Sequence, residues 1–507
     1  MPFLKNHTGP YSVGTVDLTV PIEKPITVGG AHIPDQDEDG LRLEEVAFTV
    51  FYPTDIPKGT TKYRKGLRWL TGCAPGSLQY DLPKLTSYRS LKDEIAGFQK
   101  FAGVSSLVTW LILAPFIYVY GQFIKIPIHP DAPLLHPSEP GAKWPLLIFS
   151  HGLGGNTSAY SQLCMSIAST GKVVLIIQHR DGTSPVCRTL YKGKNRTMMY
   201  VKESEVRWTV EPSDALPLRV DQLAFRQHEI YTAYAAFSKL VCGPKQHHDF
   251  GSIHFVRSGR DNTFQETWSN APIALENICL AGHSFGGCTM FSILSSKPPA
   301  HPSGHTYPRL PVRDTLIYDP WLEPLPSPGP TPFTERVADD NATLVDAQLN
   351  ETLSHNGDSQ ALTSTPRLLV MNSEAFSLWR THFERLKGVV TSWKSDAALV
   401  SLGSFGVDYF RTAAKYLAVK SAHTSFSDYH VFPLTGDKPS MRLLEIISKV
   451  SISFLDGRKD DWSVENSLKS AGAEVLHEIP EKIVIGKRPD GSNRHRWAGE
   501  VGQVVVH

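Results

Sequence analysis

The sequence predicts an α/β fold with a mostly parallel sheet that helices cover on both faces. From residue 144 onward, short apolar runs rich in β-branched residues alternate with longer segments of helical period. These runs are continuous rather than alternating, which is typical of strands that are buried on both faces. Residues 44–55 instead alternate between apolar and polar side chains, which is typical of an antiparallel strand.

Each predicted element has a defined range. Parallel strands are expected at 145–150, 172–179, 277–283, 315–319 and 367–373. Helices are expected at 157–169, 219–240 and 285–296. Residues 9–20 are expected to pair with residues 44–55, so that an N-terminal antiparallel extension continues the same sheet.

The length and composition predict one large domain. A chain of 507 residues with 41% hydrophobic residues can bury a single large core, which we expect to span residues 1–455. Within it, residues 323–366 are rich in Pro, Ser, Asn and Thr, and we expect them to form a mobile surface insertion. Residues 456–507 are expected to form a C-terminal extension that is partly disordered.

Charge and cysteine usage exclude several classes of protein. The 51 basic and 50 acidic residues leave a net charge of +1 without long runs of either sign, so nucleic acid is not an expected partner. The six cysteines form no Cys-x-x-Cys pair, so neither a disulfide framework nor a zinc site is expected. No other metal and no cofactor are expected either. The N-terminus lacks the apolar segment of a secretory signal, which predicts a cytoplasmic protein with reduced thiols.

Ser284 is the candidate nucleophile. Gly282, Ser284 and Gly286 form a Gly-x-Ser-x-Gly pattern, and Ser284 stands between a predicted strand and a predicted helix. In such a strand-to-helix turn the serine hydroxyl is exposed for attack, and the first helical amides face developing negative charge. The alternative interpretation is a tight structural turn between two glycines.

A nucleophilic serine needs a base, a carboxylate that orients the base, and fixed donors for an oxyanion. Asp319 follows the strand 315–319, at the edge of the sheet where parallel strands end. His423 lies at the tip of a small polar loop and is favoured as the base over His430. The expected oxyanion donors are the backbone amides of Leu153, in a glycine-rich loop, and Phe285, which follows the nucleophile.

With these motifs the chain resembles the platelet-activating factor acetylhydrolase family, and within it the lipoprotein-associated type. The resemblance depends on eight stretches in the family's order: GPYSVGTVDL (9–18), FYPTD (51–55), FSHGLGG (149–155), QHRD (178–181), GHSFGG (282–287), YDPW (318–321), MNSE (371–374) and HTSFSD (423–428). It implies the α/β-hydrolase fold, the triad of Ser284, Asp319 and His423, and the oxyanion amides of Leu153 and Phe285. The helix that carries Arg226 and Glu229 is also similar to a family helix.

The resemblance further implies calcium-independent hydrolysis of an acetyl, short or oxidised sn-2 acyl ester of a phospholipid. Pro320 and the long intervals after Asp319 depart from the family pattern, so the preferred acyl chain length stays open. Two other functions also stay open at this point: a general carboxylesterase for small soluble esters, and a membrane-associated scaffold without catalysis. The sequence does not predict an oligomeric state.

Residues 101–124 form a run of 24 residues without a charge, long enough to span a ~30 Å hydrocarbon core. A buried helix pair, a spanning helix and an interfacial helix all fit this run. If the segments on either side share one sheet, a single crossing would separate strands that pair. We therefore expect a helix bent at Pro115 that lies in one leaflet and binds a membrane peripherally. The side chains expected at the interface are those of Trp110, Leu111, Ile112 and Phe116.

Overall fold

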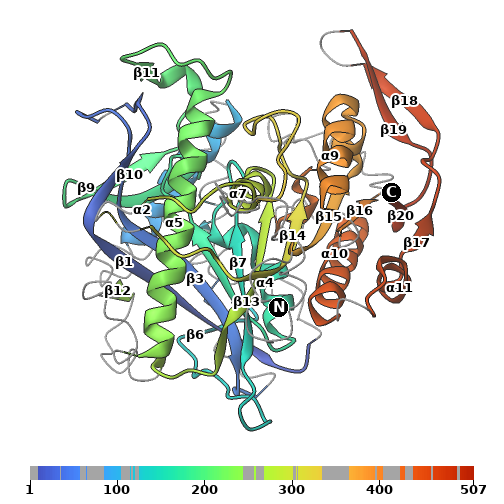
Figure 1. Ribbon diagram of the computed structural model, residues 1–507, viewed down its shortest axis with the longest axis horizontal. Helices are drawn as coiled ribbons and strands as arrows, with labels where there is room; N and C mark the ends of the chain where they lie inside the picture. The colour runs from blue at the N-terminus through green and yellow to red at the C-terminus, as the bar shows by residue number, and fades with distance from the viewer. Residues whose placement is uncertain are drawn as a thin grey trace, which may run out of the picture.

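The computed structural model describes residues 9–57, 64–65, 85–103, 125–243, 256–257, 268–333, 365–393, 397–402, 423–428, 438–457, 461–487 and 491–507, with residues 115, 118 and 119, and leaves out 35, 301–303 and 305 within these ranges. A twelve-stranded sheet runs through the described residues (Figure 1). Along the sheet the strands follow the order β12-β1-β3-β8-β7-β13-β14-β15-β16-β20-β17, and β6 pairs with β1. The sheet is the backbone of an α/β-hydrolase fold, as predicted.

The parallel part of the sheet contains the five predicted strands and one more. Its strands are β7 (Trp144–Ser150), β8 (Val173–Gln178), β13 (Ile273–His283), β14 (Val312–Tyr318), β15 (Arg367–Ser373) and β16 (Ala397–Leu402). Neighbours in the order β8-β7-β13-β14-β15-β16 are parallel throughout. The carboxyl ends of all six strands therefore meet at one edge of the sheet.

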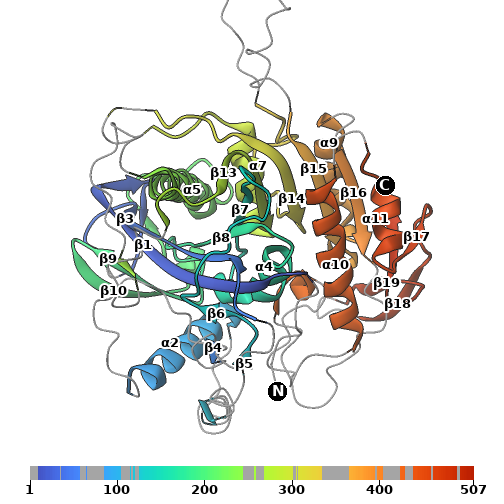
Figure 2. The ribbon, with the colours of Figure 1, turned by 90° about the horizontal axis from the view of Figure 1, so that it is seen from below.

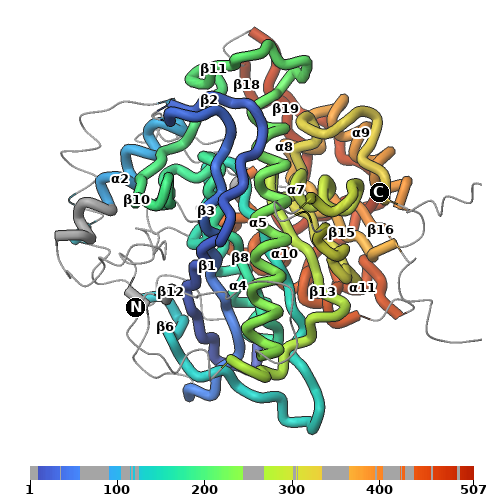
Figure 3. Tube along the Cα trace, turned by 60° about the vertical axis from the view of Figure 1, so that its left-hand side comes forward, coloured from blue at the N-terminus to red at the C-terminus, as the bar shows by residue number. Residues whose placement is uncertain are grey.

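The N-terminal antiparallel extension is confirmed. Strand β1 (Ser12–Val28) pairs antiparallel with β3 (Leu41–Thr54), and β3 pairs antiparallel with β8. Figure 3 shows β1 and β3 side by side, with the long helix α5 (Pro217–Cys242) packed along them. The edge of this part is formed by β12 (Val256–Arg257), and β6 (His129–Pro130) adds a short parallel pairing to β1.

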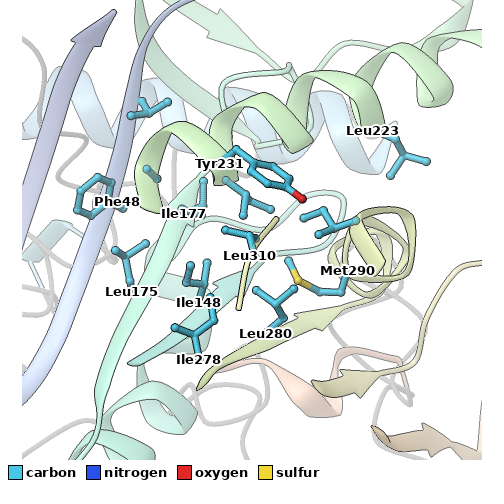
Figure 4. Close-up of a cluster of buried hydrophobic side chains, with 14 of the residues drawn as sticks. Phe48, Ile148, Leu175, Ile177, Leu223, Tyr231, Ile278, Leu280, Met290 and Leu310 are labelled. Atoms are coloured by element: carbon cyan, nitrogen blue, oxygen red, sulfur yellow. The ribbon is translucent and has the colours of Figure 1, made fainter. Parts of the chain in front are cut away.

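Helices cover both faces of the sheet because successive side chains of each strand point to opposite sides. In β8, Leu175 and Ile177 enter one core, and Val174 and Ile176 enter the other. The first core packs against α5, α7 (Phe285–Ser295) and α9 (Arg380–Ser392), and part of it is shown in Figure 4. The second core packs against α4 (Ser161–Ala168), α10 (Lys438–Asp456) and α11 (Val464–Ser470), on the opposite side in Figure 2.

The remaining helices and strands complete the described chain. They are the helices α2 (Leu85–Ala102) and α8 (Glu374–Ser377), the 3₁₀ turns Thr157–Tyr160, Glu203–Glu205 and His423–Phe426, and the strand pairs β2–β11 (Ala31–His32 and Arg207–Trp208), β4–β5 (Arg64–Lys65 and Lys125–Ile126), β9–β10 (Val186–Tyr191 and Lys194–Met199) and β18–β19 (Lys482–Lys487 and Asn493–Trp497).

The sheet continues past the expected domain boundary at residue 455. Strand β20 (Gln503–Val506) pairs antiparallel with β16, and β17 (Glu474–Leu476) pairs parallel with β20. The described part of the C-terminal extension at 456–507 therefore adds strands to the central sheet instead of standing apart from it. Most of the insertion expected at 323–366 lies outside the described residues.

The expected interfacial side chains of Trp110, Leu111, Ile112 and Phe116 lie outside the described residues. Among the helices that the structure does describe, none is both long enough and apolar enough to cross a bilayer.

The docking of the C-terminal strands can be tested with a matched pair of valines. Val504 in β20 is fully buried, and Val484 in β18 is 57% exposed. We expect Val504→Asp to lower the free energy of unfolding by about 3 kcal/mol or more, because it removes a buried side chain and places a charge in the core. Val484→Asp should change it by no more than about 0.5 kcal/mol. Urea denaturation followed by tryptophan fluorescence measures both, and equal effects would contradict the placement of β20.

Candidate active site

Ser284 lies on a sharp turn between β13 and α7. Its backbone has a φ of +58° and a ψ of −119°, a strained conformation for a residue with a side chain. The flanking glycines allow the turn: a Cβ on Gly282 would lie 2.4 Å from the Gly286 carbonyl oxygen, and one on Gly286 would lie 2.0 Å from that of Ser150. The Gly-x-Ser-x-Gly pattern is thus required by close backbone contact, as a nucleophile elbow requires.

Asp319 follows the last residue of β14 and is fully buried. It receives hydrogen bonds from the backbone amide of Ser373 to Oδ1 and from the Ser373 hydroxyl to Oδ2, each at 2.5 Å. Burial raises the pKa of Asp319, and the hydrogen bonds from His423 and Ser373 oppose that shift. Asp314, at the beginning of the same strand, instead pairs with Arg367 at the far edge of the sheet.

His423 connects the other two side chains. Its Nδ1 lies 2.9 Å from Asp319 Oδ2, and its Nε2 lies 2.7 Å from Ser284 Oγ. Since a carboxylate accepts hydrogen bonds, Nδ1 carries the proton, and Nε2 is left to accept the serine proton. The imidazole ring stacks on Phe376 at 4.3 Å with an interplanar angle of 9°. The structure thus brings together Ser284, Asp319 and His423, while His430 lies outside the described residues.

The glycine-rich loop after β7 lies directly beside the serine. A Cβ on Gly152 would lie 2.8 Å from the Ser284 Cβ. The Gly152 carbonyl accepts hydrogen bonds from His151 Nδ1 at 2.9 Å and from the Gly155 amide at 3.1 Å. Because the peptide is planar and trans, these bonds direct the Leu153 N–H to the opposite side. Within the described part of the chain, neither the Leu153 amide nor the Phe285 amide bonds another protein group.

A buried polar network packs against the glycine-rich loop after β7. Arg226, on α5 and fully buried, donates to Asp181 Oδ2 at 2.7 Å and to the His151 carbonyl at 2.8 Å, and its guanidinium lies 4.6 Å from the centre of the Phe285 ring. Next to it, Glu229 binds His179 Nδ1 at 2.6 Å and the Arg180 amide at 2.9 Å. Sequence motifs had singled out these residues without assigning them a role.

Three further side chains near the triad were missed by sequence reasoning. Ser373 holds Asp319, His283 contacts the backbone of His423, and Asp428 binds the Gln162 amide with both carboxylate oxygens at 3.0 and 3.1 Å. Each lies inside one of the eight stretches that carry the family resemblance, so its position could have been noticed. Its role could not be inferred, because it depends on contacts between segments that are far apart in the sequence.

His283, Asp319 and His423 also form the one group of metal-binding type found among the described residues, with potential ligand atoms within 4.8 Å of one another. Every ring nitrogen of the two histidines already has a hydrogen-bond partner, as do both Asp319 oxygens. A cation would have to replace these bonds. The donor set therefore fits a hydrogen-bonded triad better than a metal site.

The buried His151 generates a prediction about acid stability. Burial lowers the pKa of His151 to about 3, and the nearby Arg226 charge adds to the shift. The folded protein therefore keeps this ring neutral while the unfolded chain binds a proton below its ordinary pKa of about 6.5. Stability due to this residue is present above pH ~6.5 and is lost as the pH falls, by up to about 1.4 kcal/mol per pH unit.

We expect His151→Gln to reduce the slope of unfolding free energy against pH between pH ~6.5 and ~5 by about one proton. His477, which is 67% exposed, provides the control, and His477→Gln should leave the slope unchanged. Urea denaturation at a series of pH values measures the slope. An unchanged slope in His151→Gln would show that the ring is not held neutral.

Comparisons with known proteins agree with the resemblance inferred from the motifs. A family profile described as "Platelet-activating factor acetylhydrolase, isoform II" matches residues 90–329. A putative phospholipase A2 of Schizosaccharomyces pombe is 29% identical over 40% of this chain and 46% of its own length. The platelet-activating factor acetylhydrolase of Bos taurus is 28% identical over 40% of this chain and 42% of its own, so the chain spans less than half the length of these two relatives.

The corresponding acetylhydrolase of Canis lupus familiaris is matched more widely, at 26% identity over 76% of this chain and 71% of its own length. Among solved structures, a ferulic acid esterase from Streptomyces cinnamoneus aligns over 89% of this chain and 92% of its own, with a TM-score of 0.45 and 12% identity. That likeness is too low to bear on function. The chain is thus similar to the platelet-activating factor acetylhydrolase family, whose profile matches residues 90–329, and to relatives that carry that name.

Proposed function

We propose that the protein is a serine esterase that removes an acetyl, short or oxidised acyl chain from the sn-2 position of glycerophospholipids, without calcium. The observation that carries the proposal is the continuous set of contacts from Ser284 through His423 to Asp319, at 2.7 and 2.9 Å. The relatives named as acetylhydrolases and as a putative phospholipase A2 support a hydrolase of this class.

In the proposed mechanism each residue of the site has a role in acyl transfer. His423 accepts the proton of Ser284 as the serine oxygen attacks the ester carbonyl, and the buried Asp319 stabilises the imidazolium that forms. The amides of Leu153 and Phe285 are the proposed donors to the tetrahedral oxyanion. His423 then protonates the departing alcohol, and the same residues activate water to release the acyl group from Ser284.

Apolar side chains around the triad favour an apolar ester as the substrate. Leu153, Trp321 and Phe376 are half-buried beside Ser284 and His423, and Trp379 is 40% exposed. The Trp379 ring lies 6.0 Å from that of Phe376. A short acyl chain or a glycerol backbone would find aromatic and aliphatic surface here.

The function can be tested by measuring hydrolysis of phospholipids with sn-2 chains of graded length, with and without EDTA. We expect activity on the acetyl substrate and no inhibition by EDTA.

Ser284→Ala should lower kcat by at least ~10³-fold while the protein stays folded. Equal turnover by the variant would exclude Ser284 as the nucleophile, and loss of activity in EDTA that calcium restores would exclude the metal-free mechanism. Activity confined to monomeric soluble esters would favour a general carboxylesterase, and no activity at all would favour a scaffold.

Peripheral binding to a membrane through residues 101–124 belongs to the same proposal. Strand β3 precedes this segment in the sequence and β8 follows it, and the two are hydrogen-bonded neighbours, so a single crossing would separate paired strands. The uncharged run of 24 residues would instead place Trp110, Leu111, Ile112 and Phe116 in the interface.

We expect Leu111→Asp combined with Ile112→Asp to move the protein from liposomes into the supernatant, because several kcal/mol of membrane affinity comes from burying such side chains at ~25 cal/mol per Å². Hydrolysis of bilayer lipid should fall far more than hydrolysis of a soluble acetyl ester. Liposome sedimentation and the two assays test this. Unchanged partition, or equal loss on both substrates, would mean that the segment does not act at the interface.

A further inference from the structure

His283, the residue between Gly282 and the nucleophile, uses both of its ring nitrogens in hydrogen bonds. Its Nδ1 lies 2.8 Å from the Tyr160 hydroxyl, and its Nε2 lies 2.9 Å from the backbone carbonyl of His423. The side chain is almost completely buried. Its ring lies 4.5 Å from the His423 ring and 5.4 Å from that of Phe426.

These partners determine where the proton of His283 resides. A backbone carbonyl only accepts hydrogen bonds, so Nε2 must carry the proton and donate it to His423. In the neutral ring Nδ1 then accepts the hydrogen of the Tyr160 hydroxyl. Burial, reinforced by the nearby His423, keeps the pKa of His283 well below 6.5, so the ring stays neutral. The tautomer is thus set by the tyrosine on one side and the carbonyl on the other.

The Tyr160 hydroxyl extends this chain to the loop that holds the proposed oxyanion donor. Its oxygen accepts a hydrogen bond from the Gly152 amide at 3.2 Å. The carbonyl of the same peptide, that of His151, accepts from Arg226 at 2.8 Å. Both sides of the His151–Gly152 peptide, one peptide before the Leu153 amide, are therefore held, one by Tyr160 and the other by Arg226. The hydrogen bonds run in one direction, from Gly152 through Tyr160 and His283 to His423.

At its other end the chain holds the segment that carries the base. Contacts outside the triad also hold residues 423–428 in place. The His423 carbonyl binds His283, the buried Phe426 ring packs 5.4 Å from Tyr318, and the Asp428 carboxylate binds the Gln162 amide at the start of α4. Of these contacts, the one from His283 is made to the backbone of the base itself.

We propose that His283 is a positioning residue that couples the base to the oxyanion loop, through Nε2 to His423 and through Tyr160 to Gly152. The inference rests on the proposed ester hydrolysis at Ser284. His283 touches neither the substrate nor a reacting atom. It acts by holding the His423 backbone, so that the Nδ1 of His423 meets Asp319 and its Nε2 meets Ser284. Through Tyr160 it also fixes the position of Gly152 relative to these residues.

Two variants of His283 distinguish the contribution of its hydrogen bond to His423 from that of the rest of the side chain. In His283→Gln the amide nitrogen stands where Nε2 stood and still donates to His423. In His283→Asn the amide reaches only the position of Nδ1, so the bond to His423 is lost. Both variants remove the aromatic ring, so their comparison cancels the loss of packing against Phe426. Tyr160→Phe, a third variant, removes the hydroxyl that sets the tautomer and leaves the Gly152 amide unpaired.

The variants are compared with wild type on a soluble acetyl ester from pH 5 to 9, with active enzyme counted by titration of Ser284 with a fluorophosphonate. We expect kcat of His283→Asn to be about 10- to 100-fold below that of His283→Gln, with KM changed by less than about threefold. Asp319 stabilises the protonated base, so a displaced His423 should also move the acidic limb of kcat/KM to lower pH in His283→Asn and not in His283→Gln. Tyr160→Phe should lower kcat less than His283→Asn does, because it leaves the bond from His283 to His423 in place.

A role confined to folding would lower the titrated amount of enzyme in both variants and leave kcat per active site and the acidic limb unchanged. That result, or equal kcat in the Gln and Asn variants, would overturn the inference. Ser284→Ala is measured in parallel. If it retains wild-type turnover, the proposed function fails. If it is inactive while the His283 variants are alike, only the positioning role fails.

Discussion

Parallel pairing in register is the constraint on which the candidate site depends. Gly282 pairs with Ser150, His283 with Tyr318, and Tyr318 with Met371, so β7, β13, β14 and β15 end within about two residues of one another. Parallel strands end at one edge, and each chain must turn there before its return crossover. The glycine-rich loop, the candidate nucleophile Ser284, Asp319 and Ser373 lie where these four strands end. A shift of one residue in any pairing would move its functional group by about 3.3 Å and reverse its side chain.

The turns are held by polar groups that are costly to bury. Arg226 and Asp181 are both fully inaccessible to solvent, and their ion pair must offset a large desolvation cost. The guanidinium also bonds the His151 carbonyl and covers the Phe285 ring, so one cation touches both loops that present the proposed oxyanion amides. A hydrophobic residue of similar size could fill the space but could not orient a peptide. This explains why a charge is placed beneath the site and not a leucine.

The C-terminal segment contributes to the same site from the other side. The Trp497 amide donates to Glu374 Oε1 at 2.6 Å, at the beginning of the helix that carries Phe376. His507 Nε2 bonds the Ser401 hydroxyl at 2.8 Å, and Ser401 in turn bonds Ser377 at 2.7 Å on that helix. Since Phe376 stacks on His423, the proposed base, residues far beyond the family match support the helix that packs beside it. The extension is thus part of the architecture around the triad.

The sequence by itself determined five of the six parallel strands, the antiparallel pair β1 and β3, the α/β class and the three residues that meet at 2.7 and 2.9 Å, because each leaves a local signal. Buried strands read as continuous apolar runs, the elbow requires its glycines, and Asp319 and His423 stand where a strand or an apolar run ends. Only the tertiary structure decided the addition of β17 and β20 to the sheet, the bonds from Ser373 to Asp319, and the chain from Gly152 through Tyr160 and His283 to His423. Apart from the Gly152–Tyr160 step and the pairing of β17 with β20, these contacts join residues more than 50 positions apart. A serine, tyrosine or histidine has no periodicity that reveals its partner. Local propensity and spacing specify elements, whereas the choice of hydrogen-bond partner is made when distant loops are brought to one edge of the sheet.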